Sequence, residues 1–186
     1  DTQMGQAALS IRNLTLPDPS GGFDLVDRLS LDVRAGEIVC IYGLMGAGRT
    51  ELLETCAGRL RASAGEIVLE GQEISHLSIA ERIARGLALV PEDRQRDGLV
   101  QTMSVGENLS LASIRRFTRG LFTSARAERR LVESSIREVT VKTSGPAAPI
   151  GSLSGGNQQK VILARWLAEE IDRFVMDEPT RGIDVG

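Results

Sequence analysis

The chain has 186 residues, of which 41% are hydrophobic, and this is typical of one globular domain or of one and a half. The formal net charge is -3 and only 3% of the residues are aromatic, so neither charge nor base stacking favours nucleic acid as a partner. No apolar run reaches the length of a membrane span and no signal peptide opens the sequence, which argues against an integral membrane segment in these residues.

Three short segments before and after a central glycine loop have the alternation of β-strands. Residues 8–16 and 23–33 are predicted to form two strands separated by a turn at 17–22, where proline and glycine gather. Residues 64–71 predict a third strand and turn. Together these segments predict a small, mainly antiparallel sheet that flanks the loop.

The loop at residues 43–50, G-L-M-G-A-G-R-T, has the glycine spacing of a phosphate-binding loop. The apolar, β-prone run at 37–42 predicts a buried strand before it. The helix predicted at 50–57 has an expected apolar face that comprises Leu52, Leu53 and Cys56. In this context the glycines let backbone N–H groups turn toward phosphate oxygens, and the helix N-terminus adds a favourable dipole. A glycine-rich turn without a ligand is the alternative.

One position departs from the phosphate-loop pattern G-x-x-x-x-G-K-[ST]. Arg49 stands where lysine is expected, and an arginine is longer, planar and forked, so it is no neutral replacement. Thr50 keeps the hydroxyl that would contact Mg²⁺. We therefore expect a nucleotide site that binds but hydrolyses poorly.

The few residues of redox or metal-binding type do not predict a metal site. Cys40, in the predicted strand, and Cys56, in the predicted helix, are expected to be reduced core residues, as in a cytosolic protein, and not a disulfide or metal pair. The single histidine, His76, is expected at the surface.

The middle of the chain becomes more charged and helical. A helix is expected at 78–85 and a buried strand at 87–90, followed by a charged loop at 91–99 and helices at 105–113 and 124–139. The arginines between 115 and 130 are expected to lie on a solvent-exposed helix face and loop. This interpretation is favoured over a surface patch that binds phosphate or lipid. Residues 143–149 predict a linker of small residues and proline.

The segment L-S-G-G-N-Q-Q-K at 153–160 is predicted to open a helix that runs to about residue 169. The expected buried face of this helix comprises Val161, Ala164, Leu167 and Ala168. Ser154 can act as its N-cap, and Gly155 and Gly156 allow the backbone to approach a ligand closely.

Residues 173–180 predict a strand that ends in two adjacent carboxylates. In phosphate chemistry the first, Asp177, would hold Mg²⁺ through water. The second, Glu178, would act as general base toward the attacking water. A strand end and turn without chemistry is the alternative, but a phosphate loop in the same chain favours the catalytic interpretation.

In this order, G-L-M-G-A-G-R-T, L-S-G-G-N-Q-Q-K and F-V-M-D-E-P-T-R-G-I-D-V-G resemble an ABC-type ATPase domain. With V-P-E-D-R-Q-R-D-G-L, they resemble the second nucleotide-binding domain of simple-sugar importers of the ribose, galactose and xylose type. In that family one polypeptide carries two such domains in tandem. The resemblance covers nearly the whole chain.

The resemblance implies an α/β fold: a P-loop NTPase core with an antiparallel β subdomain and a helical signature subdomain. It assigns residues 1–92 to the β subdomain and the phosphate-loop part of the core, and 93–152 to the helical subdomain. Residues 153–186 would hold the signature helix, the carboxylate strand and the loop at the dimer seam. The last strands of the core are expected beyond Gly186.

The resemblance also implies roles for individual residues. Those expected to contact the nucleotide in the phosphate loop are Gly43, Gly46, Ala47, Gly48, Arg49 and Thr50. Those of the signature, which would close over the γ-phosphate of ATP held by the opposite domain, are Ser154, Gly155, Gly156 and Gln158. Thr50 and Asp177 would bind Mg²⁺, Glu178 would be catalytic, and Ile183 and Asp184 would cross the dimer seam.

Cofactors, partners and location follow from the same resemblance. ATP and Mg²⁺ are implied as cofactors, and the first nucleotide-binding domain of the same polypeptide and transmembrane permease subunits as direct partners. A periplasmic sugar-binding protein would be an indirect partner, and no nucleic acid is expected. The implied location is the cytoplasmic face of the bacterial inner membrane.

The departures from the family pattern lie around this domain's own nucleotide. Arg49 replaces lysine, and Glu92 stands where most relatives have a glutamine that senses Mg²⁺ and the membrane partner. The switch histidine should follow Asp177 by roughly thirty residues, beyond the end of the sequence. Phe23 is a candidate for adenine stacking, but it is closer to the phosphate loop than the stacking aromatic of the family usually is. Because the signature is intact, we expect this half to donate it to a competent site elsewhere while its own site is degenerate. The 186 residues alone are expected to have negligible ATPase activity.

The leading hypothesis is thus an ATP-binding subunit that powers monosaccharide import. A non-catalytic module that binds nucleotide, presents the signature and couples to a permease is the second. A soluble ABC ATPase of DNA repair or translation is the third, but it would carry long heptads or a basic face between the loop and the signature, and neither is present. A small-molecule kinase would not need L-S-G-G and ranks last.

Overall fold

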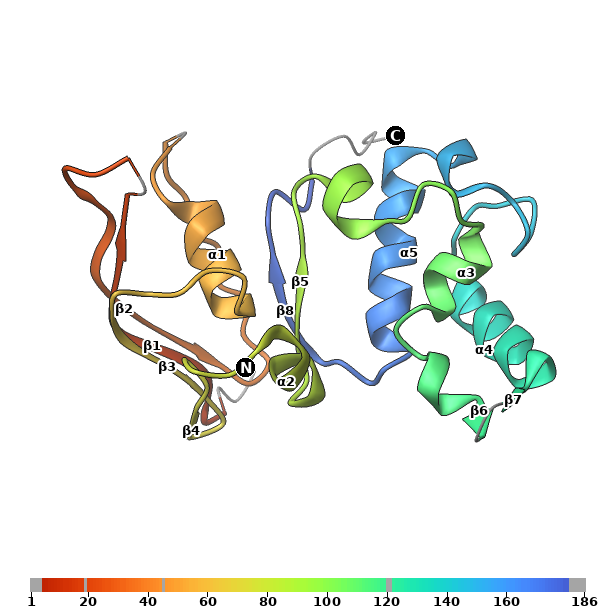
Figure 1. Ribbon diagram of the computed structural model, residues 1–186, viewed down its shortest axis with the longest axis horizontal. Coiled ribbons are helices and arrows are strands. Elements are labelled where there is room, and N and C mark those ends of the chain that lie inside the picture. Colours follow the sequence, from red (N-terminus) through yellow and green to blue (C-terminus); the bar gives the residue numbers. More distant parts are fainter. Residues whose placement is uncertain (1–4, 19, 45, 120–121, 181–186) are drawn as a thin grey trace. The chain divides into compact units, whose positions relative to one another are not determined.

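The computed structural model describes residues 5–18, 20–44, 46–119 and 122–180. The chain forms two compact units, the first ending at Leu89 and the second beginning at Val90, and each is described by itself (Figure 1). None of the described helices is both long enough and apolar enough to cross a membrane.

The first unit is built on a four-stranded antiparallel sheet, which contains the three strands predicted from the sequence and one more. Its strands are β1 (Ala7–Pro17), β2 (Asp24–Arg34), β3 (Ala64–Leu69) and β4 (Gln72–Glu73). Their order across the sheet is β2-β1-β3-β4, and every neighbouring pair is antiparallel. The three strands predicted from alternation are therefore confirmed.

An irregularity in β1 brings its apolar residues to one side. Ile11, Leu14 and Leu16 are all buried, although a strand of strict period two could not place both Ile11 and Leu14 on the same face. The register against β2 shifts between Ile11 and Leu14, where Asn13 has a φ of 47°. This bulge inserts one extra residue between Ile11 and Leu14, so that both side chains face the same side of the sheet.

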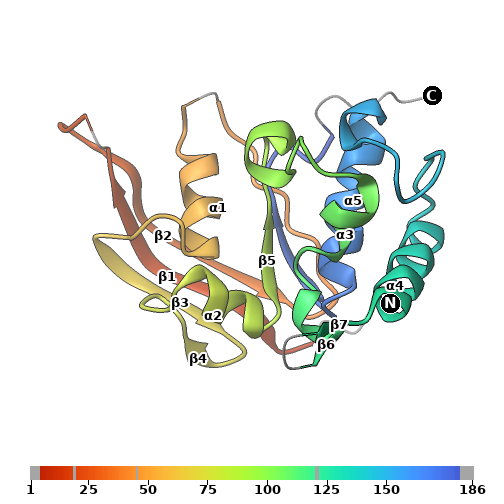
Figure 2. The same cartoon turned by 45° about the vertical axis from the view of Figure 1, so that its right-hand side comes forward.

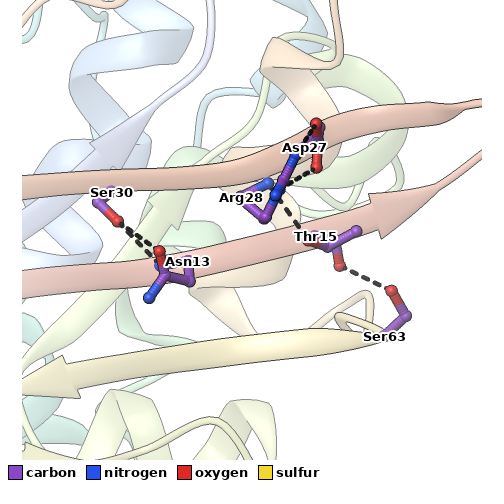
Figure 3. Close-up of polar contacts among 6 residues, drawn as sticks. All are labelled: Asn13, Thr15, Asp27, Arg28, Ser30 and Ser63. Atoms are coloured by element: carbon purple, nitrogen blue, oxygen red, sulfur yellow. Dashed lines mark hydrogen bonds and ion pairs between the residues drawn. The ribbon is translucent and has the colours of Figure 1, made fainter.

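Side chains replace the ladder hydrogen bonds that the irregular pairing of β1 and β2 leaves out (Figure 3). The backbone N–H of Asn13 donates to Ser30 Oγ at 2.9 Å, and the N–H of Arg28, whose φ is 46°, donates to Thr15 Oγ1 at 3.2 Å. On the other side of β1, Ser63 Oγ donates to the main-chain oxygen of Thr15 at 3.1 Å. These exposed polar groups therefore serve the sheet itself.

Two helices complete the first unit, α1 (Arg49–Ala57) and α2 (Ile79–Ala84). The helix α2 begins with a capping box, in which Ser78 and Glu81 exchange hydrogen bonds; these bonds hold the pKa of Glu81 below its usual value. The buried side chain of Arg82 joins the two helices through four main-chain oxygens, which belong to Thr55, Cys56, Ser75 and Leu77.

The predicted buried strand at 37–42 is wrong. These residues belong to none of the sheets in the described part of the chain, and the side chains of Ile38 and Tyr42 are 97% and 93% exposed. Cys40 is exposed as well, against the expectation of a core residue, whereas Cys56 is buried. A strand needs neighbours for its backbone N–H and C=O groups, and the four strands of this sheet pair only with one another.

The second unit is mainly helical. Its elements are η1 (Arg94–Gly98, a π-helical turn), α3 (Val105–Ser110), η2 (Ile114–Arg116), β6 (Thr118–Arg119), β7 (Phe122–Thr123), α4 (Ala125–Glu138), η3 (Ile150–Ser152), α5 (Gly155–Leu167) and β8 (Arg173–Met176). The strand β5 (Leu87–Val90) reaches this unit with Val90 and pairs with β8 in a two-stranded sheet. The predicted helices at 105–113 and 124–139 are confirmed, the first ending earlier, at Ser110.

The core of the second unit lies where α3, α4 and α5 pack side by side (Figures 1 and 2). Its most buried members are Val90, Val105, Leu109, Ile150, Val161, Ile162 and Ala164. Val161 and Ala164 face it as predicted, but Leu167 is 38% exposed, because α5 ends at that residue. Ile162 and Arg165 take up the face toward the core instead.

A polar cluster is buried in this unit between α3 and α5. Arg165 donates to the main-chain oxygens of Asn108 (2.7 Å) and Gly98 (2.8 Å), and to Asn108 Oδ1 at 3.2 Å. Asn108, which is fully buried, also bonds both backbone polar groups of Val100. Burial lowers the pKa of Arg165 to about 10. The cluster fixes the chain between η1 and α3 onto α5.

Candidate nucleotide-binding site

The glycine loop of the first unit leads directly into α1. Gly48 is the N-cap of this helix, with a φ of 73°, and it offers no side chain to the backbone N–H groups of the first turn. Gly46, with a φ of 80°, also adopts the left-handed conformation. Ala47 N–H donates to the main-chain oxygen of Leu44 at 3.1 Å, which closes a tight turn. Met45 lies outside the described residues.

Close packing fixes the end of this loop. A Cβ atom added to Gly48 would lie 2.7 Å from the main-chain oxygen of Leu25 and 3.1 Å from Val26 Cγ2, both on β2. Only glycine fits there, both for its backbone angle and for its lack of a side chain. The sheet therefore determines where α1 begins.

The side chain of Arg49 turns back along the loop that precedes it. A Cβ atom added to Gly43 would lie 3.5 Å from Arg49 Cδ and 3.3 Å from the Cβ of Ala47. The apolar stem of the arginine thus covers Gly43. Thr50, the next residue of α1, is half-buried, and Phe23, considered for adenine stacking, is 63% exposed.

The predicted signature lies at the start of α5 in the second unit. Ser154 occupies the N-cap position, and its main-chain oxygen accepts from Gln158 N–H at 2.9 Å. Its hydroxyl does not cap the helix as expected; it accepts instead from Asn157 Nδ2 at 2.9 Å, while Asn157 Oδ1 accepts from the backbone of Lys142. Gly155 and Gly156 are half-buried at the first turn.

The side chain of Gln158, the fourth predicted signature residue, points into the protein. It is 3% exposed, and its Nε2 donates to the main-chain oxygen of Ile150 at 3.3 Å. This contact joins α5 to the short turn η3. Gln158 therefore contributes to the base of the signature helix, and its own backbone N–H is already used inside the helix.

The two adjacent carboxylates follow β8. Asp177 is 8% exposed, and its backbone N–H donates to the main-chain oxygen of Val90 at 3.0 Å, which continues the pairing of β8 with β5. Glu178 is half-buried and has a φ of 43°, an unusual backbone angle for a residue with a side chain. Residues held at such angles cluster at functional sites.

The charged segment 91–99 has more structure than the predicted loop. Asp93 caps η1, because its side chain accepts from the backbone N–H groups of Gln95 and Arg96. Glu92, half-buried, precedes this turn. Arg94 donates hydrogen bonds to α5 and is therefore a candidate functional residue that the sequence analysis missed. The sequence D-R-Q-R around it does not indicate a partner that is distant in the chain.

The second unit thus brings together the segment 91–99, the signature and the carboxylates Asp177 and Glu178, whereas the phosphate loop lies in the first unit. Ile183 and Asp184 lie outside the described residues. Among the residues that the structure covers, no group of three histidine, cysteine or acidic side chains could hold a metal ion by itself. The assignment of Thr50 and Asp177 to Mg²⁺ therefore stays a prediction.

Comparison with known proteins identifies the family. The model of the ABC transporter family matches residues 26–181, most of the chain. The chain belongs to the ABC transporter family. Among its curated ABC transporter relatives are an arabinose import ATP-binding protein of Burkholderia thailandensis, 48% identical over 183 residues, and a ribose import ATP-binding protein of Halalkalibacterium halodurans, 43% identical over 182 residues. Each alignment covers 98% of this chain but only 34% and 35% of the relative, so the chain spans about a third of their length.

Solved ABC transporter structures share the fold. An ATP-binding cassette in a dimeric, post-hydrolysis state with ADP and Pi superposes with a TM-score of 0.79 at 22% identity, and covers 95% of this chain and 76% of the other. A nucleotide-free cassette from an ABC transporter gives a TM-score of 0.77 at 24% identity, with 96% and 72% covered. The predicted α/β fold of an ABC ATPase is therefore confirmed.

Proposed function

We propose that this chain is part of the ATP-hydrolysing subunit of a monosaccharide importer. The observation that carries the proposal is the near-complete match, at 43% to 48% identity, to proteins named for arabinose and ribose import. The phosphate loop supports it locally, since its two left-handed glycines and an uncapped helix N-terminus suit a phosphate ligand.

In this proposal the residues keep the roles predicted from the sequence. Gly43, Gly46, Ala47, Gly48 and Arg49 would surround the phosphates of ATP. Thr50 and Asp177 would hold Mg²⁺, which neutralises phosphate charge when bound. Glu178 would accept a proton from the attacking water. Its backbone angle supports a constrained orientation of that carboxylate.

The two nucleotide-binding domains of the full-length transporter ATPase would contribute unequally to ATP hydrolysis. Arg49 in place of lysine, with Glu92 in place of glutamine, would leave this half's own site weak. The first turn of α5, with Ser154, Gly155 and Gly156, would complete the γ-phosphate site of the first nucleotide-binding domain. Gln158 would support that turn from inside, in keeping with its burial and its bond to Ile150.

The remaining expectations belong to the same proposal. The partners would be permease subunits in the membrane and, through them, a periplasmic sugar-binding protein, with the ATPase at the cytoplasmic face of the inner membrane. The division into 1–92, 93–152 and 153–186 is retained as a proposal about subdomains. A non-catalytic coupling module is the second candidate, and the replacement of the phosphate-loop lysine by Arg49 favours it.

The test is the steady-state ATPase activity of the full-length protein with its permease. Gly155→Asp should abolish most activity, because it places a carboxylate where the signature meets phosphate, whereas Arg49→Ala should cost much less. Gly151→Ala is the matched control, since a Cβ atom at Gly151 meets nothing within 4 Å. If Arg49→Ala were as damaging as Gly155→Asp, the arginine would be a working substitute for lysine, and the asymmetric assignment would be wrong.

Sugar uptake separates the importer from the alternatives. Vesicles that contain the complete transporter should accumulate radiolabelled arabinose or ribose only with ATP. ATP hydrolysis that no pentose or hexose stimulates would contradict the importer.

A further inference from the structure

The turn η1 is attached to the signature helix at both of its ends. At the start of η1, Arg94 Nη1 donates to the main-chain oxygen of Gly155 at 3.2 Å and to Gln159 Oε1 at 3.0 Å. These acceptors belong to the first two turns of α5. A single guanidinium therefore spans the beginning of the signature helix.

At the other end of η1, Gly98 packs against the middle of α5. A Cβ atom added there would lie 2.6 Å from Ile162 Cδ1, and the main-chain oxygen of Gly98 accepts from Arg165 Nη1 at 2.8 Å. Both contacts are buried. This end of η1 is thus fixed by core packing and by the Asn108 cluster.

The contacted positions follow one face of the helix. Gly155, Gln159 and Ile162 are related as i, i+4 and i+7, so they lie in a row along α5. The turn η1 consequently lies along that row, with its Gly98 end anchored in the core and its Arg94 end at the helix N-terminus. Asp93 stiffens the start of the turn by accepting two backbone N–H groups.

We propose that Arg94 is a positioning residue that sets the orientation of the signature turn. The charged side chain joins a segment just after Glu92 to the two acceptors at the start of α5. A displacement of residues 92–94 would then be carried to Gly155 directly. The inference rests on the proposed function, in which this turn closes on ATP held by the first nucleotide-binding domain.

A purely structural role for Arg94 makes a different prediction. Its side chain and its acceptor Gly155, in the first turn of α5, are both half-buried, unlike the buried Arg165. Loss of a positioning contact should loosen the first turn alone. Loss of a structural contact should lower the stability of the whole unit and affect every helix in it.

The experiment compares variants of the full-length protein in complex with its permease. Arg94→Ala should raise the KM for ATP by about tenfold, the equivalent of about one hydrogen bond to a charged group, and should change kcat less. Arg94→Lys should give an intermediate KM, because an ammonium group can donate but lacks the planar fork. Arg96→Ala, which removes an arginine whose side chain is 82% exposed in the same turn, is the matched control and should leave KM unchanged.

Two further readouts tie the effect to the contact. Hydrogen exchange in Arg94→Ala should accelerate in the peptide 153–160 and stay unchanged in α3 and α4. With Gln159→Ala, the double variant should be little worse than Arg94→Ala alone, because both remove the same bond. Exchange that rises throughout the second unit, or a KM equal to that of Arg96→Ala, would overturn the proposal.

Gly155→Asp separates a failure of this inference from a failure of the proposed function. If Gly155→Asp abolishes ATPase activity while Arg94→Ala behaves like Arg96→Ala, only the role of Arg94 is wrong. If Gly155→Asp leaves activity intact, the signature is not used as proposed, and the inference fails with it.

Discussion

Arg82 and Thr55 are joined by a short hydrogen bond inside the first unit, from Nη1 of the arginine to the main-chain oxygen at the end of α1, 2.7 Å away. The same nitrogen donates to the oxygen of Cys56 at 2.8 Å. The last carbonyl groups of a helix have no partner within it, so they need donors from elsewhere. Arg82 supplies them from α2, although its side chain is only 2% exposed and burial lowers its pKa.

Arg82→Ala should therefore destabilise the first unit strongly. It would leave four main-chain oxygens without their donor, at a cost of about 3 kcal/mol or more in the free energy of unfolding. Arg85→Ala is the control, because Arg85 makes one exposed bond to the oxygen of Glu81, and it should change that free energy by less than about 0.5 kcal/mol. Urea unfolding of the purified chain measures both, and equal midpoints would contradict the assigned role.

The thiol of Cys56 should make stability depend on alkaline pH. Burial raises the pKa of this thiol to about 12 from its ordinary value of 9.0, so the folded state keeps the proton that the unfolded chain releases. The associated stability is complete below pH 9.0 and is lost as the pH rises toward 12. The free energy of unfolding should therefore fall as the pH rises from 9.0 toward about 12, and Cys56→Ala should reduce that fall.

Thiol labelling tests the difference in exposure between Cys40 and Cys56. A thiol reagent should modify the exposed Cys40 rapidly and Cys56 only after denaturation. Rapid modification of two thiols per folded chain would contradict the burial of Cys56. Cys40→Ser provides the control, since it should leave the folded chain unreactive.

The two left-handed glycines of the phosphate loop should differ in their tolerance of alanine. Gly46→Ala adds a side chain that meets nothing within 4 Å, so only backbone strain, about 1 kcal/mol, is expected. Gly48→Ala also forces a Cβ atom to within 2.7 Å of the Leu25 oxygen and should cost about 2 kcal/mol or more. Chemical denaturation measures the order, and a Gly46→Ala chain less stable than Gly48→Ala would refute the packing argument.

Asn108→Ala should loosen the segment that joins η1 to α3. It removes the side chain that pairs both backbone groups of Val100 and one acceptor of Arg165, at an expected cost of about 2 to 3 kcal/mol. Gln101→Ala, which removes an exposed side chain from the same segment, should be nearly neutral. Thermal unfolding gives the ranking, and faster hydrogen exchange at residues 98–104 should accompany it.

Much of the fold could be predicted because local sequence patterns determine most of its strands and helices. Strands β1, β2 and β3 follow from alternation, and α4 lies within the helix expected at 124–139. The failures concern tertiary partners. Residues 37–42 have the composition of a strand but no neighbour in the described sheets, and Leu167 fits the helical period but falls at the end of α5.

The site could be predicted as motifs but not as contacts. The glycine loop and the carboxylate pair were predicted from residue types and spacing, and the signature from the resemblance to ABC-type ATPases; their roles stay predictions. Arg82, Arg94 and Arg165 were missed because their acceptors are backbone oxygens, or amide groups far away in sequence, and arginine usually indicates a solvated surface. No composition rule distinguishes such an arginine from its exposed neighbours.

The acceptors of the two fully enclosed arginines have one more consequence. Arg82 and Arg165 both donate to neutral oxygens, and within the described part of the chain neither bonds a carboxylate. Mobile ions weaken attraction between exposed charges over a distance of about 10 Å at 0.1 M ionic strength, but they reach buried dipoles poorly. The attraction between exposed ion pairs such as Arg28 and Asp27 should weaken in concentrated salt, whereas the buried hydrogen bonds of both units should keep their strength. The folded protein should therefore tolerate changes in ionic strength.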